Sequence, residues 1–239
     1  PEAGYRAAID PLLLAAAVPA AEGARALDLG CGVGAAGLAL LTRAPGIAVD
    51  GMELDAEMAR LAAENASLNG FADRFRVLLG DVLSPPRAVA SAGYDQVLCN
   101  PPYLEAARAD PPRLPTRQRA EVEQLGKLSD WVAAALAFAR PGGHVTFVHR
   151  ADRLPELLSS LRKGAGDIAV FPLWPRRERP AKRIVVQARR GARGPARLLA
   201  GLVLHEADGS YSEAAEAVLR LGEELDLQGP QRNPEQRKQ

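Results

Sequence analysis

The chain has 239 residues, of which 47% are hydrophobic and 25% charged, and this profile excludes a disordered or fibrous protein. The formal net charge of +1 excludes a strongly basic or acidic protein, so overall charge indicates no particular partner. This length fits one α/β domain over residues 1–227, followed by a polar tail over residues 228–239.

Cysteine usage and targeting features suggest an intracellular protein. Cys31 and Cys99 show no CxxC spacing, which indicates a reducing compartment rather than a disulfide framework. The apolar stretch at residues 12–18 is too short to span a bilayer and lacks the basic flank of a signal peptide. We therefore expect a cytoplasmic protein with no membrane segment, and no feature indicates an oligomeric state. No metal site is expected, because metal-ligand spacing is absent among the three histidines, His144, His149 and His205.

Short β-branched or leucine-rich runs alternate with alanine-rich segments of helical periodicity. The expected strands are residues 24–29, 47–53, 75–80, 94–99 and 144–149, with a later one at 184–186. The expected helices are residues 35–42, 55–69 and 121–140. In the second helix, apolar residues recur every three or four positions, which predicts that one face packs on a sheet. The alternation predicts an α/β fold with a mostly parallel sheet and helices on both faces.

A glycine-rich loop, DLGCGVG at residues 28–34, follows the first expected strand and opens the next helix. Glycines at alternate positions leave no β-carbons in the way, so the backbone can approach a cofactor closely. The helix N-terminus then offers N–H groups to an anionic group. Residues 32–37 also match the dinucleotide fingerprint GxGxxG, with Glu53 about 20 residues further on. The loop alone leaves a dehydrogenase open, although Asp28 ahead of the glycines is typical of methyltransferases.

Acidic residues stand at the ends of two further expected strands. Glu53 ends the second strand, where its carboxylate can accept hydrogen bonds from two ribose hydroxyls. Asp81 follows the third strand and can accept a bond from an adenine amine. Each acid alone also fits a solvated strand end or a turn. With Asp28, however, three acids at three successive strand ends favour one nucleotide site.

The tetrapeptide Asn100, Pro101, Pro102 and Tyr103 directly follows the fourth expected strand. Two prolines fix φ and stiffen the turn, so the Asn100 side-chain oxygen and the Pro101 carbonyl can be held as paired acceptors. Two rigid acceptors that take both N–H bonds of an exocyclic amine localise its lone pair and aim it at a methyl donor. Tyr103 offers a flat face on which a base can stack. An isolated motif of this kind also fits a plain turn beside a core aromatic, but its position after the nucleotide loop favours catalysis.

These motifs together resemble the class I methyltransferases that methylate amino groups. Further segments are similar to the bacterial tRNA adenine-N6 methyltransferases that act next to the valine tRNA anticodon; these segments are residues 4–10, 12–15, 141–143 and 202–211. The resemblance covers nearly the whole chain. It implies a Rossmann-like, seven-stranded, mostly parallel sheet whose last strand runs antiparallel. One departure is Leu104, where many relatives carry an aromatic residue that would form the outer wall of the base pocket.

The resemblance implies S-adenosylmethionine as cofactor and an RNA, above all tRNA, as substrate. Asn100 and Pro101 would grip the target amine, with Pro102 stiffening the turn and Tyr103 stacking on the base. The expected cofactor contacts are Asp28, Gly30, Cys31, Gly32, Gly34, Glu53, Leu54, Asp81, Val82 and Asn100.

Two other substrates stay open, a glutamine amide in a protein and a base in ribosomal RNA. Glutamine enzymes usually carry a helical substrate domain ahead of the catalytic one, and the two dozen or so residues before the first strand argue against it. A DNA adenine enzyme would need a target-recognition insert, for which we see no room.

Two segments depart from the strand–helix pattern. Leu104 to Arg119 carries three prolines and four arginines without apolar periodicity, which predicts a loop. Arg176 to Arg197 carries nine lysines or arginines against one acid, Glu178. This basic stretch fits either RNA phosphate binding or an arginine-rich solvated strand pair. Trp174 just ahead of it leans towards nucleic acid.

Overall fold

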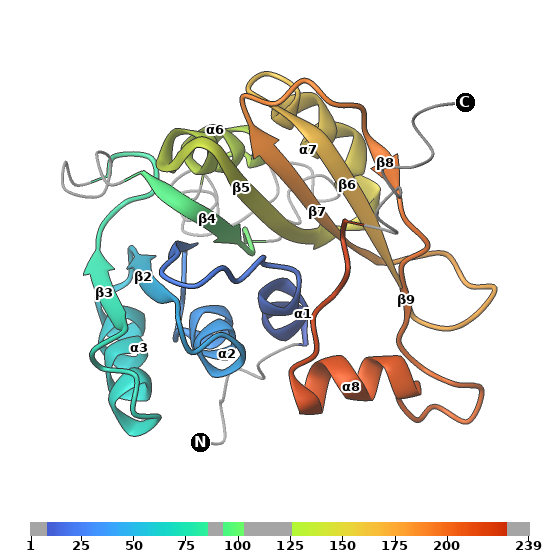
Figure 1. The fold of residues 1–239 in the computed structure, drawn as a ribbon, viewed down its shortest axis with the longest axis horizontal. Helices are drawn as coiled ribbons and strands as arrows, with labels where there is room; N and C mark the ends of the chain where they lie inside the picture. Colours follow the sequence, from blue (N-terminus) through green and yellow to red (C-terminus); the bar gives the residue numbers. More distant parts are fainter. Residues whose placement is uncertain (1–8, 86–92, 103–125, 229–239) are drawn as a thin grey trace, which may run out of the picture.

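A nine-stranded sheet forms the centre of the computed structural model, which describes residues 9–85, 93–102 and 126–228 (Figure 1). The strands are β1 (Arg25–Leu29), β2 (Ala48–Glu53), β3 (Phe75–Leu79), β4 (Tyr94–Cys99), β5 (Ala139–Arg150), β6 (Ala165–Trp174), β7 (Arg183–Arg190), β8 (Arg197–Leu198) and β9 (Leu202–Val203). Their order is β3-β2-β1-β4-β5-β7-β6-β8, with β9 also paired to β6.

The sheet is mostly parallel. β1 pairs in parallel with β2 and β4, β2 with β3, and β4 with β5, whereas β7 runs antiparallel to both β5 and β6. The expected mostly parallel sheet with an antiparallel late strand is therefore confirmed. The sheet has nine strands rather than the seven that the resemblance implies, because the two-residue strands β8 and β9 both pair with β6, at the side of the sheet away from β3. Pro172 has no N–H to donate and lies between the β6 residues that pair with β8 and those that pair with β9.

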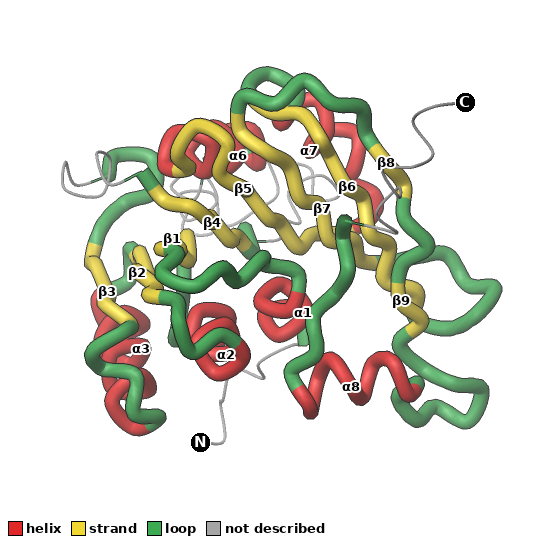
Figure 2. The backbone as a smooth tube through the Cα atoms, in the orientation of Figure 1, coloured by secondary structure: helices red, strands yellow, loops and turns green. Residues whose placement is uncertain are grey.

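Helices cover both faces of the sheet, as the alternation of elements predicts (Figure 2). One face carries α1 (Asp10–Ala16), α2 (Ala35–Arg43), α3 (Ala56–Leu68) and α8 (Glu213–Leu221), and the other carries α6 (Leu128–Phe138) and α7 (Leu154–Leu161). Each layer buries its own apolar cluster against the sheet, the first around Leu13 and Leu40 and the second around Phe138 and Phe147. None of the described helices is long and apolar enough to cross a membrane.

The expected helix at residues 121–140 is shorter at both ends, since α6 begins at Leu128 after Lys127, whose backbone is extended with φ −87° and ψ 159°. α6 ends at Phe138, and Ala139 is already extended, with φ −63° and ψ 140°, as the first residue of β5. Pro141 disfavours helical backbone at the residue before it, which explains the early end. Gly143 is then needed for pairing with β4, because a β-carbon there would lie 2.9 Å from the Tyr94 carbonyl oxygen. Residues 121–125 lie outside the described part.

Candidate active site

The predicted site segments meet at one edge of the sheet, because parallel strands end at the same edge. Leu29 at the end of β1 is level with Met52 of β2 on one side and with Cys99 of β4 on the other. The glycine loop therefore leaves the sheet between Glu53 and Asn100. β1 lies where the strand order changes direction, between β2 and β4, and open α/β sheets bind ligands at such a switch point.

Two positions of the glycine loop have backbone angles that favour glycine. Gly30 has φ +72° and Gly34, directly before α2, has φ +87°, both in the left-handed region. A β-carbon at Gly30 would also lie 2.8 Å from the Trp131 ring of α6. The loop is thus pressed against α6 on one side, and its backbone is left open towards the strand-end edge.

Hydrogen bonds from neighbouring elements hold this loop in one conformation. The N–H groups of Gly30 and Cys31 donate to the Met52 carbonyl at 2.9 and 3.0 Å. From α3, Asn65 Nδ2 donates to the Val33 carbonyl at 3.0 Å. The sequence analysis did not assign Asn65 to the site, because it occupies a position in the regular spacing of the apolar residues of the helix. Its hydrogen bond to the loop was therefore not expected. These hydrogen bonds preorganise the loop.

Asp28 lies beneath the loop and anchors the start of α2. Its carboxylate accepts a hydrogen bond of 2.9 Å from the Gly37 N–H and is only 3% exposed. Burial raises the pKa of Asp28 to about 7; the Gly37 bond opposes this rise, and the charge of Glu53 adds to it. The carboxyl group therefore exists in both protonation states near neutral pH.

Glu53 connects the loop to the end of β2. Its Oε2 accepts from the Gly32 N–H at 2.8 Å, and its Oε1 accepts from the N–H groups of Leu54 and Asp55, each at 2.9 Å. A carboxylate has about four acceptor positions, so capacity remains for a hydroxyl donor. The Leu54 side chain next to it is 42% exposed, an apolar surface at the same strand end.

Asp81 forms a tight turn after β3. Its carboxylate accepts from the Leu83 N–H at 2.8 Å, as a turn residue does, and it remains half-buried. Val82 is buried in the apolar cluster on the α6 side of the sheet, and Cys31 is buried in the other. Any ligand contact from Cys31 would come from its backbone, whereas Val82 also lines a groove along α6.

Asn100 follows β4 directly, and its side-chain Oδ1 is buried without a hydrogen-bond partner among the described residues. An orphaned buried acceptor costs about 1–3 kcal/mol, so native structures keep few of them. Pro101 is buried and Pro102 half-buried behind it, which fixes the turn. Tyr103 lies outside the described residues, so its stacking role stays a prediction.

A small cavity backs the Pro101–Pro102 turn and brings in two residues that the sequence analysis did not assign to the site. His149 and Arg153, at and just beyond the end of β5, line it together with Trp131 of α6. His149 is 2% exposed, and burial lowers its pKa to about 4, with the charge of Arg153 acting in the same direction. This imidazole is neutral at neutral pH. Its position at the end of the strand next to β4 was the signal that could have found it.

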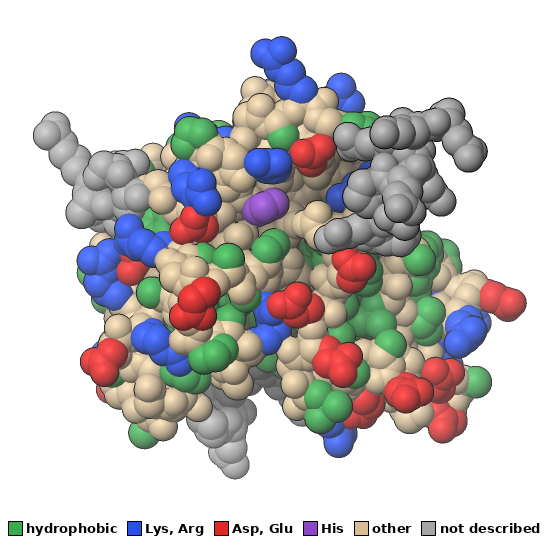
Figure 3. All heavy atoms as spheres, in the orientation of Figure 1, with side chains coloured by type: hydrophobic (Ala, Val, Ile, Leu, Met, Phe, Trp, Pro, Cys, Tyr) green, Lys and Arg blue, Asp and Glu red, His purple; other side chains and the backbone are tan. Residues whose placement is uncertain are grey.

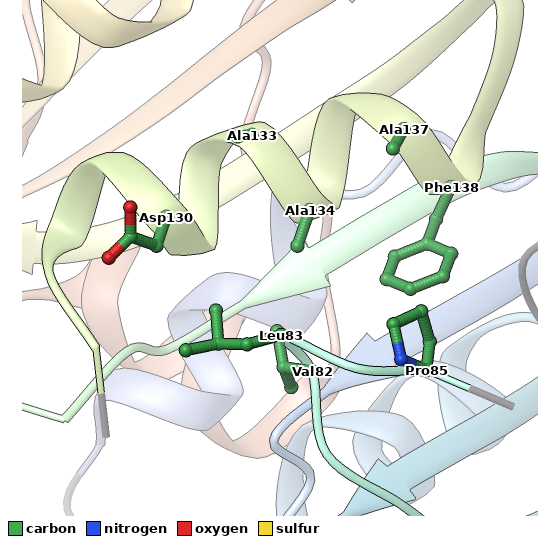
Figure 4. Close-up of a pocket in the computed structure, with 8 residues that line it drawn as sticks. All are labelled: Val82, Leu83, Pro85, Asp130, Ala133, Ala134, Ala137 and Phe138. Atoms are coloured by element: carbon green, nitrogen blue, oxygen red, sulfur yellow. The ribbon is translucent and has the colours of Figure 1, made fainter. Parts of the chain in front are cut away.

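A larger groove of about 490 Å³ lies along α6 (Figure 4). Its walls are apolar, with Val82, Leu83 and Pro85 facing the alanines of the helix. Asp130 is the one titratable group among its described lining residues, and it accepts a 2.8 Å bond from the Lys127 N–H at the start of α6. The groove therefore offers no group for chemistry, and the strand-end edge remains the candidate active site.

The basic stretch from Arg176 to Arg197 does not form one patch, because β7 carries its two halves to opposite edges of the sheet. The first half is the β6–β7 turn, residues 175–182, at the edge where Asn100 lies. In the second half, the side chains of Arg189, Arg190 and Arg197 donate to backbone carbonyls, to Gly142 at 3.2 Å, Ala137 at 3.1 Å and Leu227 at 3.2 Å. These three arginines of the second half are therefore structural, whereas Arg193 is exposed.

Comparison with known proteins places this chain in a family. The model of the methyltransferase small domain matches residues 8–153. A "tRNA1(Val) (adenine(37)-N6)-methyltransferase" of Dickeya chrysanthemi is 30% identical over 88% of this chain and 85% of that protein. A "Release factor glutamine methyltransferase" of Chlorobaculum tepidum is 29% identical over 66% of this chain and 56% of that protein.

Among solved structures, a predicted O-methyltransferase of Agrobacterium tumefaciens aligns with a TM-score of 0.75 and 26% identity, over 90% of this chain and 98% of that one. The strand order and the glycine loop define the Rossmann-like fold of class I methyltransferases. The chain belongs to the methyltransferase small domain family.

Proposed function

We propose that this enzyme transfers a methyl group from S-adenosylmethionine to the N6 amine of an adenine in tRNA, with adenine 37 of a valine tRNA as the first candidate. The observation that carries the proposal is the buried, unpartnered Asn100 Oδ1 at the end of β4, one strand from the glycine loop. The Dickeya relative supports the choice of tRNA, because it is named as a tRNA methyltransferase and aligns over most of both chains.

The strand-end edge fits the cofactor in each of its parts. The loop at Gly30, Gly32 and Gly34 presents backbone without β-carbons, and Glu53 keeps acceptor capacity for ribose hydroxyls. Leu54 adds an apolar surface against which the adenine ring of the cofactor can pack. When bound, S-adenosylmethionine supplies a methyl group on an electrophilic sulfonium. The remaining proposed contacts are Asp28, beneath the loop, the Asp81 carboxylate, which can accept from the adenine amine, and Cys31 and Val82.

The target amine is positioned by the turn after β4. Asn100 Oδ1 accepts one N–H and the Pro101 carbonyl accepts the other, so the lone pair is drawn out of conjugation with the ring and points at the methyl donor. Pro102 prevents the turn from relaxing. Since both acceptors exist before substrate arrives, little reorganisation is needed during transfer. An adenine must be unstacked to reach this edge, which favours a loop base over a paired one, and Tyr103 would stack on it. A tRNA substrate would place the enzyme in the cytoplasm.

A glutamine amide presents the same two N–H donors to Asn100 and Pro101, so the site chemistry alone admits a protein substrate. The Chlorobaculum relative makes this the second candidate. The two are separated by where the methyl group appears, in nucleoside or in protein.

The test incubates the full chain with methyl-labelled S-adenosylmethionine and bulk tRNA lacking the modification, followed by nucleoside analysis. We expect label as N6-methyladenosine and a fall of roughly 10²–10³ in rate for Asn100→Ala, with cofactor affinity largely kept. Cofactor binding with no label on tRNA would overturn the tRNA assignment, and label in added protein would support the amide substrate.

A further inference from the structure

The β6–β7 turn, residues 175–182, differs from the rest of the basic stretch because its cations are exposed at the active-site edge. We propose that Arg177, Arg179 and Lys182 bind the RNA phosphates next to the target adenine. This proposal rests on the proposed RNA substrate and names the surface that holds it.

Strand pairing places the turn on the correct edge. Arg183, the first residue of β7, pairs with Leu173 of β6 and with Arg150, the last residue of β5. The turn therefore projects beyond the carboxyl ends of β5 and β6, as Asn100 lies beyond the end of β4. The order β4-β5-β7-β6 puts two to three strand spacings, about 10–14 Å, between Asn100 and the turn. That separation is too large for contact with the target amine and suits neighbouring nucleotides.

The charges of the turn are free to bind a ligand. Arg177, Arg179 and Lys182 are exposed, and within the described residues their side chains form no hydrogen bond or ion pair. Their neighbours are engaged, since Arg183 pairs with Asp10 at 3.0 Å and Arg176 interacts with Asp208. One acid, Glu178, stands within the turn. Because unpaired cations neutralise phosphates and release counterions, these three side chains suit a nucleic-acid backbone.

Hydrogen bonds anchor both ends of the turn, so its backbone would need little ordering on binding. The Pro175 carbonyl accepts from the His205 N–H at 3.2 Å, and the Trp174 carbonyl accepts from the Leu204 N–H at 2.8 Å. On the β5 side, the Lys182 carbonyl accepts from the Ala151 N–H at 3.1 Å. A preorganised cationic surface loses less conformational entropy on binding than a flexible one.

Acidic side chains limit where the RNA can run. They gather over α8 at the lower right of Figure 3, and Glu213 and Glu216 lie in the first turn of that helix. This charge repels phosphate from the α8 face. The favourable course for the RNA runs from the β6–β7 turn across the amino end of β7 and the carboxyl end of β5 towards Asn100.

The test compares two triple variants that each remove three exposed positive charges. The turn variant is Arg177→Gln, Arg179→Gln, Lys182→Gln. The control is Arg162→Gln, Lys163→Gln, Arg193→Gln, at exposed positions near the opposite edge. The probe is a fluorescein-labelled anticodon stem-loop RNA, titrated with the full chain by anisotropy at several salt concentrations. Affinity for S-adenosylhomocysteine and the thermal unfolding midpoint are measured in parallel.

We expect the turn variant to bind the RNA about tenfold more weakly or worse, with the slope of log K against log salt smaller by roughly two. RNA binding by the control variant should stay near wild type. The cofactor affinity and the unfolding midpoint of both variants should also stay near wild type. Equal weakening in both variants would show a general charge effect and overturn the assignment. Wild-type RNA binding and methylation by the turn variant would overturn this surface while leaving the proposed function intact. If wild type binds cofactor but no RNA, both proposals fail.

Discussion

The Gly32 N–H donates a 2.8 Å hydrogen bond to the Glu53 carboxylate, and this contact joins the glycine loop after β1 to the end of β2. The same carboxylate accepts from Leu54 and Asp55, whose side chain in turn caps α3 by accepting from Met58 and Glu57. Glu53 thus sets the conformation of the loop, besides being the proposed ribose acceptor. Removing this carboxylate should therefore weaken cofactor binding in two ways, by loosening the loop and by removing the ribose acceptor.

Substitution Glu53→Gln tests this double role. The amide keeps one acceptor oxygen but turns an NH₂ group towards backbone N–H donors, so part of the loop loses its support. We expect affinity for S-adenosylhomocysteine to fall about tenfold to hundredfold by titration calorimetry. Glu57→Gln, on the exposed face of α3 where Glu57 pairs with Arg60, is the control and should bind as wild type. Wild-type affinity in Glu53→Gln would contradict the role.

Asn65→Ala removes the one α3 side chain that bonds the loop, at the Val33 carbonyl. A buried or half-buried hydrogen bond of this kind contributes about 1 kcal/mol, so cofactor affinity should fall roughly fivefold. Asn69→Ala provides a matched control, because Asn69 Nδ2 donates to the Asn65 carbonyl within the same helix and touches no loop residue in the described bonds. Calorimetry on both variants decides the matter: equal affinities would show that Asn65 does not position the loop.

The strand-end residues were predictable because the elements beneath them are short, apolar and bounded by turn residues. β4 begins at Tyr94 and ends at Cys99, as expected from the sequence, and this places Asn100 directly. A late strand at residues 184–186 was also expected, and it is the antiparallel strand β7. Parallel pairing then needs no further information to bring the four strand ends to one edge.

Other parts depended on contacts that are distant in sequence. β6 contains Pro172, which weakens its strand pattern, and its pairing with β7 is visible only in three dimensions. The basic stretch could not be divided from sequence, because its division depends on β7 running between two edges. Arg190 illustrates the difference, since its guanidinium donates to Ala137 at the end of α6, 53 positions away in sequence.

Asp28 predicts a pH-dependent contribution to stability. Its pKa of about 7 in the folded chain lies above the ordinary aspartate value of 3.8, so the folded state binds the proton more tightly. This contribution is therefore fully present below pH 3.8 and is lost as pH rises through about 7. Asp28→Asn keeps an oxygen for the Gly37 N–H but cannot ionise. The unfolding midpoint of wild type relative to this variant should decrease between about pH 4 and 7 and then level off. A constant difference across that range would contradict the assigned pKa.

Gly30→Ala should destabilise the protein for two separable reasons. An L-residue at φ +72° is strained by about 1–3 kcal/mol, and the new methyl would also press on Trp131, where its carbon lies 2.8 Å from the ring. Gly23→Ala isolates the first cause, because Gly23 has φ +74° and nothing within 4 Å of its added carbon. We expect chemical denaturation to show a larger loss of unfolding free energy for Gly30→Ala than for Gly23→Ala, with cofactor affinity lowered only at Gly30. Equal losses would mean that the loop and α6 move apart readily, and that close packing against Trp131 does not set the loop conformation.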